Sequence, residues 1–226
     1  MRTITVLAIW FSVSCAALAA ETDTLPADEA TGALTQALTQ SIEAVVDRLG
    51  VTNGFLDNPK VKITLPRSLQ KAEGLMRRLG GSKHADNLIL AMNRAAETAT
   101  AEARPVLMEV MQNMSINDAT GILTGGDGSV TQYFRVTSAE ELSKKFLPIV
   151  KNATDQANLL KRYNEFAGKG AKFGFVPEKH ANIENYVTQK TLDGIFLIMA
   201  EEERAIRSDP VGQGNTLLQK VLGFTK

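Results

Sequence analysis

The chain has 226 residues, 44% of them hydrophobic and 22% charged, and its 25 basic residues equal its 25 acidic residues in number. This composition is typical of a globular protein and argues against a disordered chain or a disulfide-rich mini-domain, since there is only one cysteine. A formal net charge of zero, with lysines scattered along the chain, also argues against a nucleic-acid-binding protein.

Residues 1–19 have the pattern of a secretory signal peptide. Arg2 precedes an apolar run over residues 4–19 that ends in the small-x-small triplet Ala17-Leu18-Ala19. This run is shorter than the roughly 20 residues that a transmembrane helix needs. We therefore expect residues 20–226 to form an exported, periplasmic protein with no integral membrane span. Cleavage would also remove the single cysteine, so the mature chain would have no thiol for a disulfide, a nucleophile or a metal.

Apolar residues recur every three or four positions through most of the remaining chain, which is the spacing of an amphipathic helix. Several predicted boundaries depend on cap signals. Ser82 is a candidate N-cap, residues 115–118 resemble a capping box with Asp118 in the acidic position, and Thr137 with Glu140 forms a second such pattern. Pro148 is expected to kink or interrupt its helix. The predicted helices cover residues 26–49, 66–79, 82–99, 105–114, a short stretch to about 123, 137–149, 181–207 as the longest, and a final turn or two at 217–222.

Two segments lack this spacing. In the first, residues 51–65, Asn53-Gly54 and Asn58-Pro59 are turn signals, and the apolar residues of 61–65 alternate with period two. We interpret it as a loop that ends in one short extended piece. The second, residues 168–177, is rich in glycine and is predicted to be a loop or hinge. With no repeat and no long linker, the sequence predicts an all-α fold: a single-domain multi-helix bundle with at most one short extended segment.

Recognised catalytic and metal-binding motifs are missing from the sequence. The two histidines, His84 and His180, are far apart and form no zinc-binding pair. There is no serine nucleophile elbow, no phosphate-binding loop with its lysine, and no calcium-loop spacing at Asp127. We therefore expect no metal and no cofactor, and no enzymatic role is favoured.

Polar residues on otherwise apolar helices are the remaining candidates. Arg94 and Glu97 can pair across one helical turn, and Glu203 and Arg207 are spaced as an i, i+4 pair. Arg94 and Glu97 could form a solvated surface pair, or could lie near a pocket because the alanines around them let another helix approach closely. A catalytic pair of Glu97 and Glu202 would require that the two carboxylates meet in space.

A series of ordered motifs resembles one protein family. They include Gly54-Phe55, Asn58-Pro59, Leu65-Pro66, Met92-Asn93-Arg94-Ala95-Ala96-Glu97, Met114-Ser115-Ile116-Asn117-Asp118-Ala119, Thr131-Gln132-Tyr133-Phe134-Arg135, Tyr186-Val187-Thr188, Asp193-Gly194-Ile195-Phe196 and Ala200-Glu201-Glu202-Glu203. The chain resembles domain of unknown function 4197, a group of mostly proteobacterial exported proteins, over about residues 49–224. The resemblance implies no activity. It implies that the motif residues are mostly polar or glycine and are set among helices.

If the polar motif residues gather, they form either a ligand-binding cluster or a buried network that fixes helix packing. This candidate cluster consists of Asn93, Arg94, Glu97, Asp118, Thr131, Tyr133, Arg135, Tyr186, Asp193, Glu202 and Arg207.

Two functions from different classes remain. The first is a non-enzymatic periplasmic binding or interaction module for an apolar, lipid-like ligand or an envelope protein, with methionines 92, 108, 111, 114 and 199 lining an adaptable cavity or simply filling a core. The second is a carboxylate-based hydrolase or lyase, with Glu97 or Glu202 as base and Arg94 or Arg207 binding an anion. An apolar cavity with a polar mouth would favour the binding module. Two carboxylates beside an arginine in a cleft would favour the hydrolase or lyase.

Overall fold

Most of the described helices form where the apolar spacing is continuous, and each buries an apolar face. The computed structural model describes residues 26–171, 183–209 and 212. Within these residues the chain forms eight helices and no strand, so the predicted all-α fold is confirmed. The helices are α1 (Ala27–Leu49), α2 (Arg67–Arg78), α3 (Ser82–Glu102), α4 (Arg104–Gln112), α5 (Ala119–Leu123), α6 (Ser129–Gln156), α7 (Leu159–Ala171) and α8 (Ile183–Ser208).

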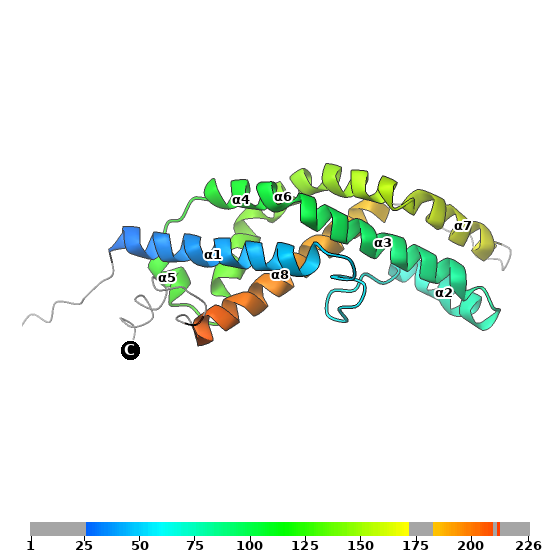
Figure 1. Ribbon diagram of the computed structural model, residues 1–226, viewed down its shortest axis with the longest axis horizontal. Helices are drawn as coiled ribbons and strands as arrows, with labels where there is room; N and C mark the ends of the chain where they lie inside the picture. The colour runs from blue at the N-terminus through cyan, green and yellow to red at the C-terminus, as the bar shows by residue number, and fades with distance from the viewer. Residues whose placement is uncertain (1–25, 172–182, 210–211, 213–226) are drawn as a thin grey trace, which may run out of the picture.

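The bundle is elongated, with α3 along its middle (Figure 1). Helix α3 packs against α1, α2, α6, α7 and α8, while α8 also packs along α6 and against α1. At one end of the molecule lie α2, the start of α3 and the end of α7 (Figure 1). The start of α1, α5 and the end of α8 lie at the opposite end (Figure 1).

Small side chains explain how α3 can contact so many neighbours. Its predicted apolar side, formed by Leu88, Met92, Ala95 and Ala99, is fully buried. Alanines on this side let the axes of neighbouring helices approach closely. Met92 and Met199 are fully buried in the same hydrophobic core. The core is therefore a contiguous apolar interior in which these methionines fill space.

Helix α6 corrects the predicted start at Thr137. It begins at Ser129, eight residues earlier, and the Thr137 hydroxyl donates to the Tyr133 carbonyl oxygen at 2.8 Å instead of capping a helix. The reason is tertiary, because Val130 and Phe134 are buried and stabilise this extra length. Pro148 lies inside α6 and does not end it. At 28 residues α6 exceeds the 26 residues of α8, so the prediction of the longest helix was also wrong.

Two predicted caps were also wrong. Ser82 is the first residue of α3, whose N-cap is Gly81 with no side-chain hydrogen bond. In front of α5 it is the Asp118 carboxylate that caps, accepting the backbone N–H of Gly121 at 2.8 Å. Ser115 has another role, described below. In a capping box the first of the four residues, here Ser115, would be the N-cap. In this chain the N-cap is instead the fourth residue, Asp118.

Further boundaries differ from the prediction. Helix α4 ends at Gln112, so Met114 follows it, and Leu79 is 54% exposed because α2 ends at Arg78. The first part of the predicted 168–177 loop is helical, since α7 extends to residue 171. The rest of that predicted loop, the predicted signal peptide, residues 181–182 and the predicted final turn at 217–222 lie outside the described residues.

Candidate functional site

The 51–65 loop is fixed to α3 by Asn93, which is fully buried. The Asn93 side-chain oxygen accepts the Ile63 backbone N–H at 2.9 Å, and its amide nitrogen donates to the Ile63 carbonyl oxygen at 2.8 Å. This pairing satisfies both backbone groups of Ile63 as a strand neighbour would. Burial alternates as predicted, with Ile63 buried and Lys62 and Thr64 exposed. The side chains of Lys62 and Thr64 therefore point outward.

A second clamp holds the first part of the same loop. Glu97 is 4% exposed, and one carboxylate oxygen accepts the backbone N–H groups of Phe55 and Leu56, each at 3.1 Å. Its other oxygen accepts from Arg94 at 2.5 Å, and Arg94 also donates to the Asn53 side chain at 2.6 Å. The predicted Arg94–Glu97 pair is thus present. Both clamps hold the 51–65 loop against α3.

The loop forms one wall of an open pocket of about 390 Å³. Helix α8 contributes a stripe of side chains one helical turn apart, including Tyr186, Lys190, Asp193 and Leu197, and α6 contributes Arg135. The Tyr186 hydroxyl donates to the Thr64 carbonyl oxygen at 2.9 Å, which joins α8 to the loop. Burial raises the pKa of Tyr186 above its ordinary value, so its phenol is a neutral donor at neutral pH.

We call this site the cationic pocket because its lining has more positive than negative groups. Four lining side chains are cationic (Lys60, Lys62, Arg135 and Lys190), whereas Asp193 is the one acid among them. Asp193 is shared, since Arg135 lies 2.9 Å from one of its oxygens and Lys190 lies 3.3 Å from the other.

The two lysines of the loop differ in their partners. Lys60 pairs with Glu201 at 2.6 Å, at the margin of the cationic pocket, and this hydrogen bond lowers the pKa of Glu201. Lys62 has no acidic partner among the described residues. The pocket therefore keeps an excess of positive charge even after its ion pairs are counted.

A second pocket, of about 180 Å³, adjoins the first and shares Arg135, Asp193 and Leu197 with it. Its lining adds apolar surface from Phe196 and Ala200. The Arg135 guanidinium lies over the Phe196 ring, 5.4 Å from its centroid, which holds the cation between the two pockets. The 40%-exposed Leu197 side chain forms apolar surface in both pockets.

A separate polar group lies at the start of α6. Glu203 is 3% exposed, and its two oxygens accept the backbone N–H groups of Val130 and Thr131 at 3.0 and 2.8 Å. Arg207 pairs with Glu203 at 2.8 Å, which is the predicted i, i+4 pair, and also donates to the Leu123 carbonyl oxygen at 2.6 Å. The Glu203 carboxylate, on α8, thus caps the N-terminus of α6. Its negative charge also interacts favourably with the positive end of the α6 dipole.

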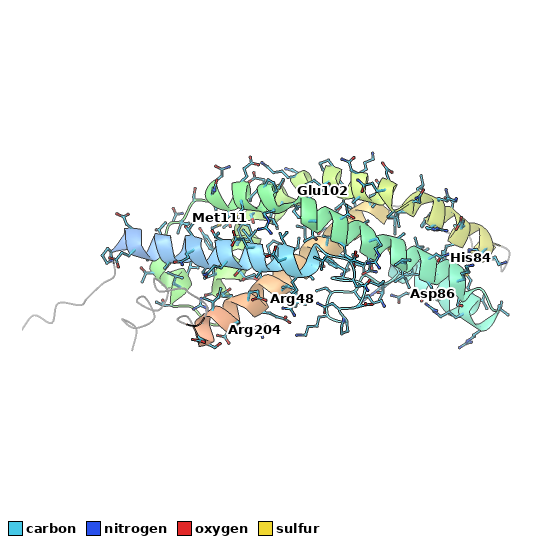
Figure 2. The ribbon with its side chains drawn as sticks, viewed as in Figure 1. Arg48, His84, Asp86, Glu102, Met111 and Arg204 are labelled. Atoms are coloured by element: carbon cyan, nitrogen blue, oxygen red, sulfur yellow. The ribbon has the colours of Figure 1, made fainter. Side chains whose placement is uncertain are left out.

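The remaining candidates have partners outside the two pockets. Tyr133 donates to the Ser115 carbonyl oxygen at 2.6 Å and fixes the segment before α5. Glu202 pairs with Arg48, at the end of α1 in Figure 2, at 3.1 Å. Glu202 and Glu97 have different partners, and no hydrogen bond among the described residues joins these two carboxylates.

The structure thus divides the predicted cluster over several places. Arg135, Tyr186 and Asp193 line the cationic pocket, and Thr131 lines its neighbour. The other candidates hold the loop, α5, α6 or the α1–α8 contact. Sequence reasoning missed Lys60, Lys62 and Lys190, although the alternation over 61–65 already places Lys62 on the outward side.

Comparison with known families covers almost the whole chain. The family described as "Protein of unknown function (DUF4197)" matches residues 24–223. The chain belongs to this family. The resemblance noted in the motifs is thereby confirmed and begins earlier in the chain than the motifs indicated. No curated protein and no solved structure matches the chain.

Two general properties of the described residues bear on the site. None of their helices combines the length and apolar character that crossing a bilayer requires. Among the same residues, no group of three or more His, Cys, Asp or Glu side chains is placed to hold a metal ion.

Proposed function

We propose that this DUF4197 protein is an exported, non-enzymatic binding module whose cationic pocket takes a small amphiphilic anion. The observation that carries the proposal is the pocket of about 390 Å³ that four cationic side chains and one carboxylate line. Export is inferred from residues 1–19 alone, and periplasmic location follows from it.

The charges of the pocket support an anionic group. An incoming carboxylate or phosphate could accept from Lys62, which has no acidic partner among the described residues, and from Lys190. It would also compete with Asp193 for Arg135, whose side chain is 47% exposed and therefore within reach of a ligand from solvent. The Tyr186 hydroxyl donates its proton to the Thr64 carbonyl oxygen and is neutral, so it does not repel an anion.

The neighbouring pocket supports an apolar part on the same ligand. Leu197, Phe196 and Ala200 provide apolar surface beyond Arg135, and Leu197 is 40% exposed. An acyl chain that started from the cationic pocket would cover this surface and remove it from water. The ligand is therefore lipid-like in having both parts, but it binds on the surface between α6 and α8.

The hydrolase or lyase alternative gains no support from the contacts of its carboxylates. Both oxygens of Glu97 are already occupied, by two backbone N–H groups and by Arg94. Glu202 pairs with Arg48. Neither carboxylate lines the two pockets described above, and the contacts of both join parts of the fold.

Isothermal titration with dodecanoate tests the proposal. We expect a dissociation constant on the order of 100 µM, a value typical of a small ligand in an open site. Dodecyltrimethylammonium has the same chain with the opposite charge, and acetate has the same head without the chain. Both should bind at least tenfold more weakly if the site needs an anionic head and an apolar tail.

A pair of matched variants locates the site. Lys62→Gln with Lys190→Gln removes two cations of the pocket and should weaken dodecanoate binding about tenfold or more. Lys151→Gln with Lys161→Gln removes two exposed cations elsewhere and should leave binding unchanged. Equal affinity in both double variants, or binding of dodecyltrimethylammonium as tight as that of dodecanoate, would refute the proposed site.

A further inference from the structure

Helix α2 presents an unusual outer face at one end of the molecule. It packs mainly against α3 and buries Leu69, Ala72 and Met76. Figure 1 shows α2 at the end of the elongated bundle, and Figure 2 places His84 and Asp86 of α3 at the same end. The opposite side of α2 is exposed over its full length.

This outer face is positively charged. Arg67, Lys71 and Arg78 are spaced by four and seven residues, so they share one side of α2, and Lys83 follows at the start of α3. All four side chains are exposed, and none has an acidic partner among the described residues. Residues 67–86 contain five basic and two acidic residues, whereas the whole chain is neutral. The molecule therefore has a positive end.

Apolar side chains flank this charge. Leu75 is 39% and Leu79 is 54% exposed, and both lie on the same flank of the basic stripe. Arg77 lies on the other flank, where Glu73 and Asp86 neutralise it at 2.8 and 2.7 Å. Leucines beside unpaired lysines and arginines are the arrangement by which a helix lies in the surface of an anionic bilayer.

We propose that this end of the molecule, which we call the α2 tip (residues 67–83), docks on an anionic lipid membrane. Arg67, Lys71, Arg78 and Lys83 contact the lipid headgroups, and Leu75 and Leu79 enter the boundary between headgroups and acyl chains. Charge complementarity favours a bilayer surface, because the unpaired charges form one outward stripe at the end of the molecule. Neither of the two pockets described above lies on α2.

The proposal is independent of the function assigned to the cationic pocket. The two features nevertheless adjoin along the chain, because Lys62 and Thr64 of the pocket precede α2 by a few residues. Docking of the α2 tip would thus bring the loop wall of the pocket near the membrane. Vesicle binding and dodecanoate binding can be measured separately, and either can fail without the other.

Co-sedimentation with phosphatidylcholine vesicles tests the docking. We expect the purified protein to bind vesicles that contain about one-third phosphatidylglycerol at least tenfold more tightly than vesicles of phosphatidylcholine alone. Salt at about 0.5 M should abolish this preference, because it screens the headgroup charge. Equal binding to both vesicle types would overturn the proposal.

Variants assign the binding to the tip. Lys71→Glu with Arg78→Glu should weaken binding to anionic vesicles at least tenfold, and Leu75→Ser with Leu79→Ser should weaken it several-fold. The control Lys144→Glu with Lys151→Glu reverses two exposed charges on α6 and should leave binding unchanged. Circular dichroism establishes that each variant is folded, and the leucine variant, which changes no charge, replaces the first if that one unfolds. Unchanged binding in both tip variants contradicts the proposal.

Two further measurements separate a membrane from an acidic protein. A dye attached at Leu79→Cys should shift its emission to the blue on anionic vesicles, because the side chain enters an apolar layer. Labelled poly-glutamate serves as the acidic-protein probe. If Lys71→Glu with Arg78→Glu loses poly-glutamate binding while vesicle binding and the dye signal stay unchanged, the tip is a protein-binding surface and the membrane proposal is wrong.

Discussion

Replacing Glu203 by alanine tests whether a buried carboxylate on α8 sets the start of α6. The side chain is 3% exposed and accepts the backbone N–H groups of Val130 and Thr131, together with Arg207 at 2.8 Å. Alanine leaves two amide groups without their acceptor and a 9%-exposed guanidinium without its counter-charge. Each of these changes is costly in a buried site.

The expected loss follows from these contacts. Removing one partner of a buried ion pair costs about 3–5 kcal/mol, and losing an N-cap costs about 1 kcal/mol. Arg207 retains the Leu123 carbonyl oxygen and the Ser129 hydroxyl as acceptors, which favours the lower end. We expect Glu203→Ala to lower the free energy of unfolding by about 3 kcal/mol. For a chain of this size that corresponds to a fall in Tm of roughly 6–12 °C.

Urea denaturation followed by circular dichroism measures this loss. The neighbouring Glu202→Ala is the matched control, because its surface pair with Arg48 is worth less than about 1 kcal/mol. Amide hydrogen exchange adds a local readout. The amides of Val130 and Thr131 should exchange faster in Glu203→Ala, whereas their exchange rates should be unchanged in Glu202→Ala. The reasoning fails if the two variants lose equal stability, or if protection of the two amides survives the loss of the carboxylate.

The remaining predictions concern two glycines and the ion pair of the loop. Gly194→Ala would place a Cβ 2.8 Å from the Phe55 ring, so we expect a loss of about 1–3 kcal/mol in urea denaturation. In Gly74→Ala the new Cβ meets nothing within 4 Å in the exposed part of α2, so the variant should gain about 0.5–1 kcal/mol. A loss of stability would show that another part of the molecule contacts α2 at this position. The hydrogen bond from Lys60 lowers the pKa of Glu201 in the folded protein, so its stabilisation is present above the ordinary carboxyl pKa and is lost as pH falls through the lowered value. Carbon-13 NMR titration should show the pKa of Glu201 rising toward its ordinary value in Lys60→Met, and an unchanged pKa would remove Lys60 as the cause.

Local apolar spacing is sufficient to predict most of the helices. It places α1 to within one residue, because Leu34, Leu38 and Leu49 bury one continuous face and Pro26 and Gly50 bound it. Cap signals are weaker, since a threonine inside a helix can bond to the preceding turn as readily as it can cap one. Thr137 does so in α6, where burial of Phe134 decides the helix boundary.

The candidate site was harder to predict because its contacts join residues far apart in sequence. Three consecutive glutamates lie on α8, and the sequence interpretation placed Glu202 in the candidate cluster. Glu203 is the buried one, and its spacing from buried Met199 and Ile206, four and three residues away, was a usable signal. No local pattern predicts that Glu203 reaches the amides of Val130 and Thr131, more than 70 residues away.

The pairing of Asn93 with Ile63 is equally remote from any local pattern, at 30 residues. Hydrophobic periodicity specifies which side of an element is buried, whereas hydrogen-bond partners depend on how the elements pack. The cationic pocket arises in this way, because the loop, α6 and α8 each contribute only a part of its lining.

The most direct test of the central claim is an amide NMR titration of the protein with dodecanoate. The account predicts saturable shifts concentrated in residues 60–64, at Arg135 and in residues 186–200, with the start of α1 and α5 unaffected. The same titration in Lys62→Gln with Lys190→Gln should need at least tenfold more ligand to reach half-saturation. Shifts that lie elsewhere, or that are equal in the protein and the double variant, would contradict the assignment of the cationic pocket as the ligand site.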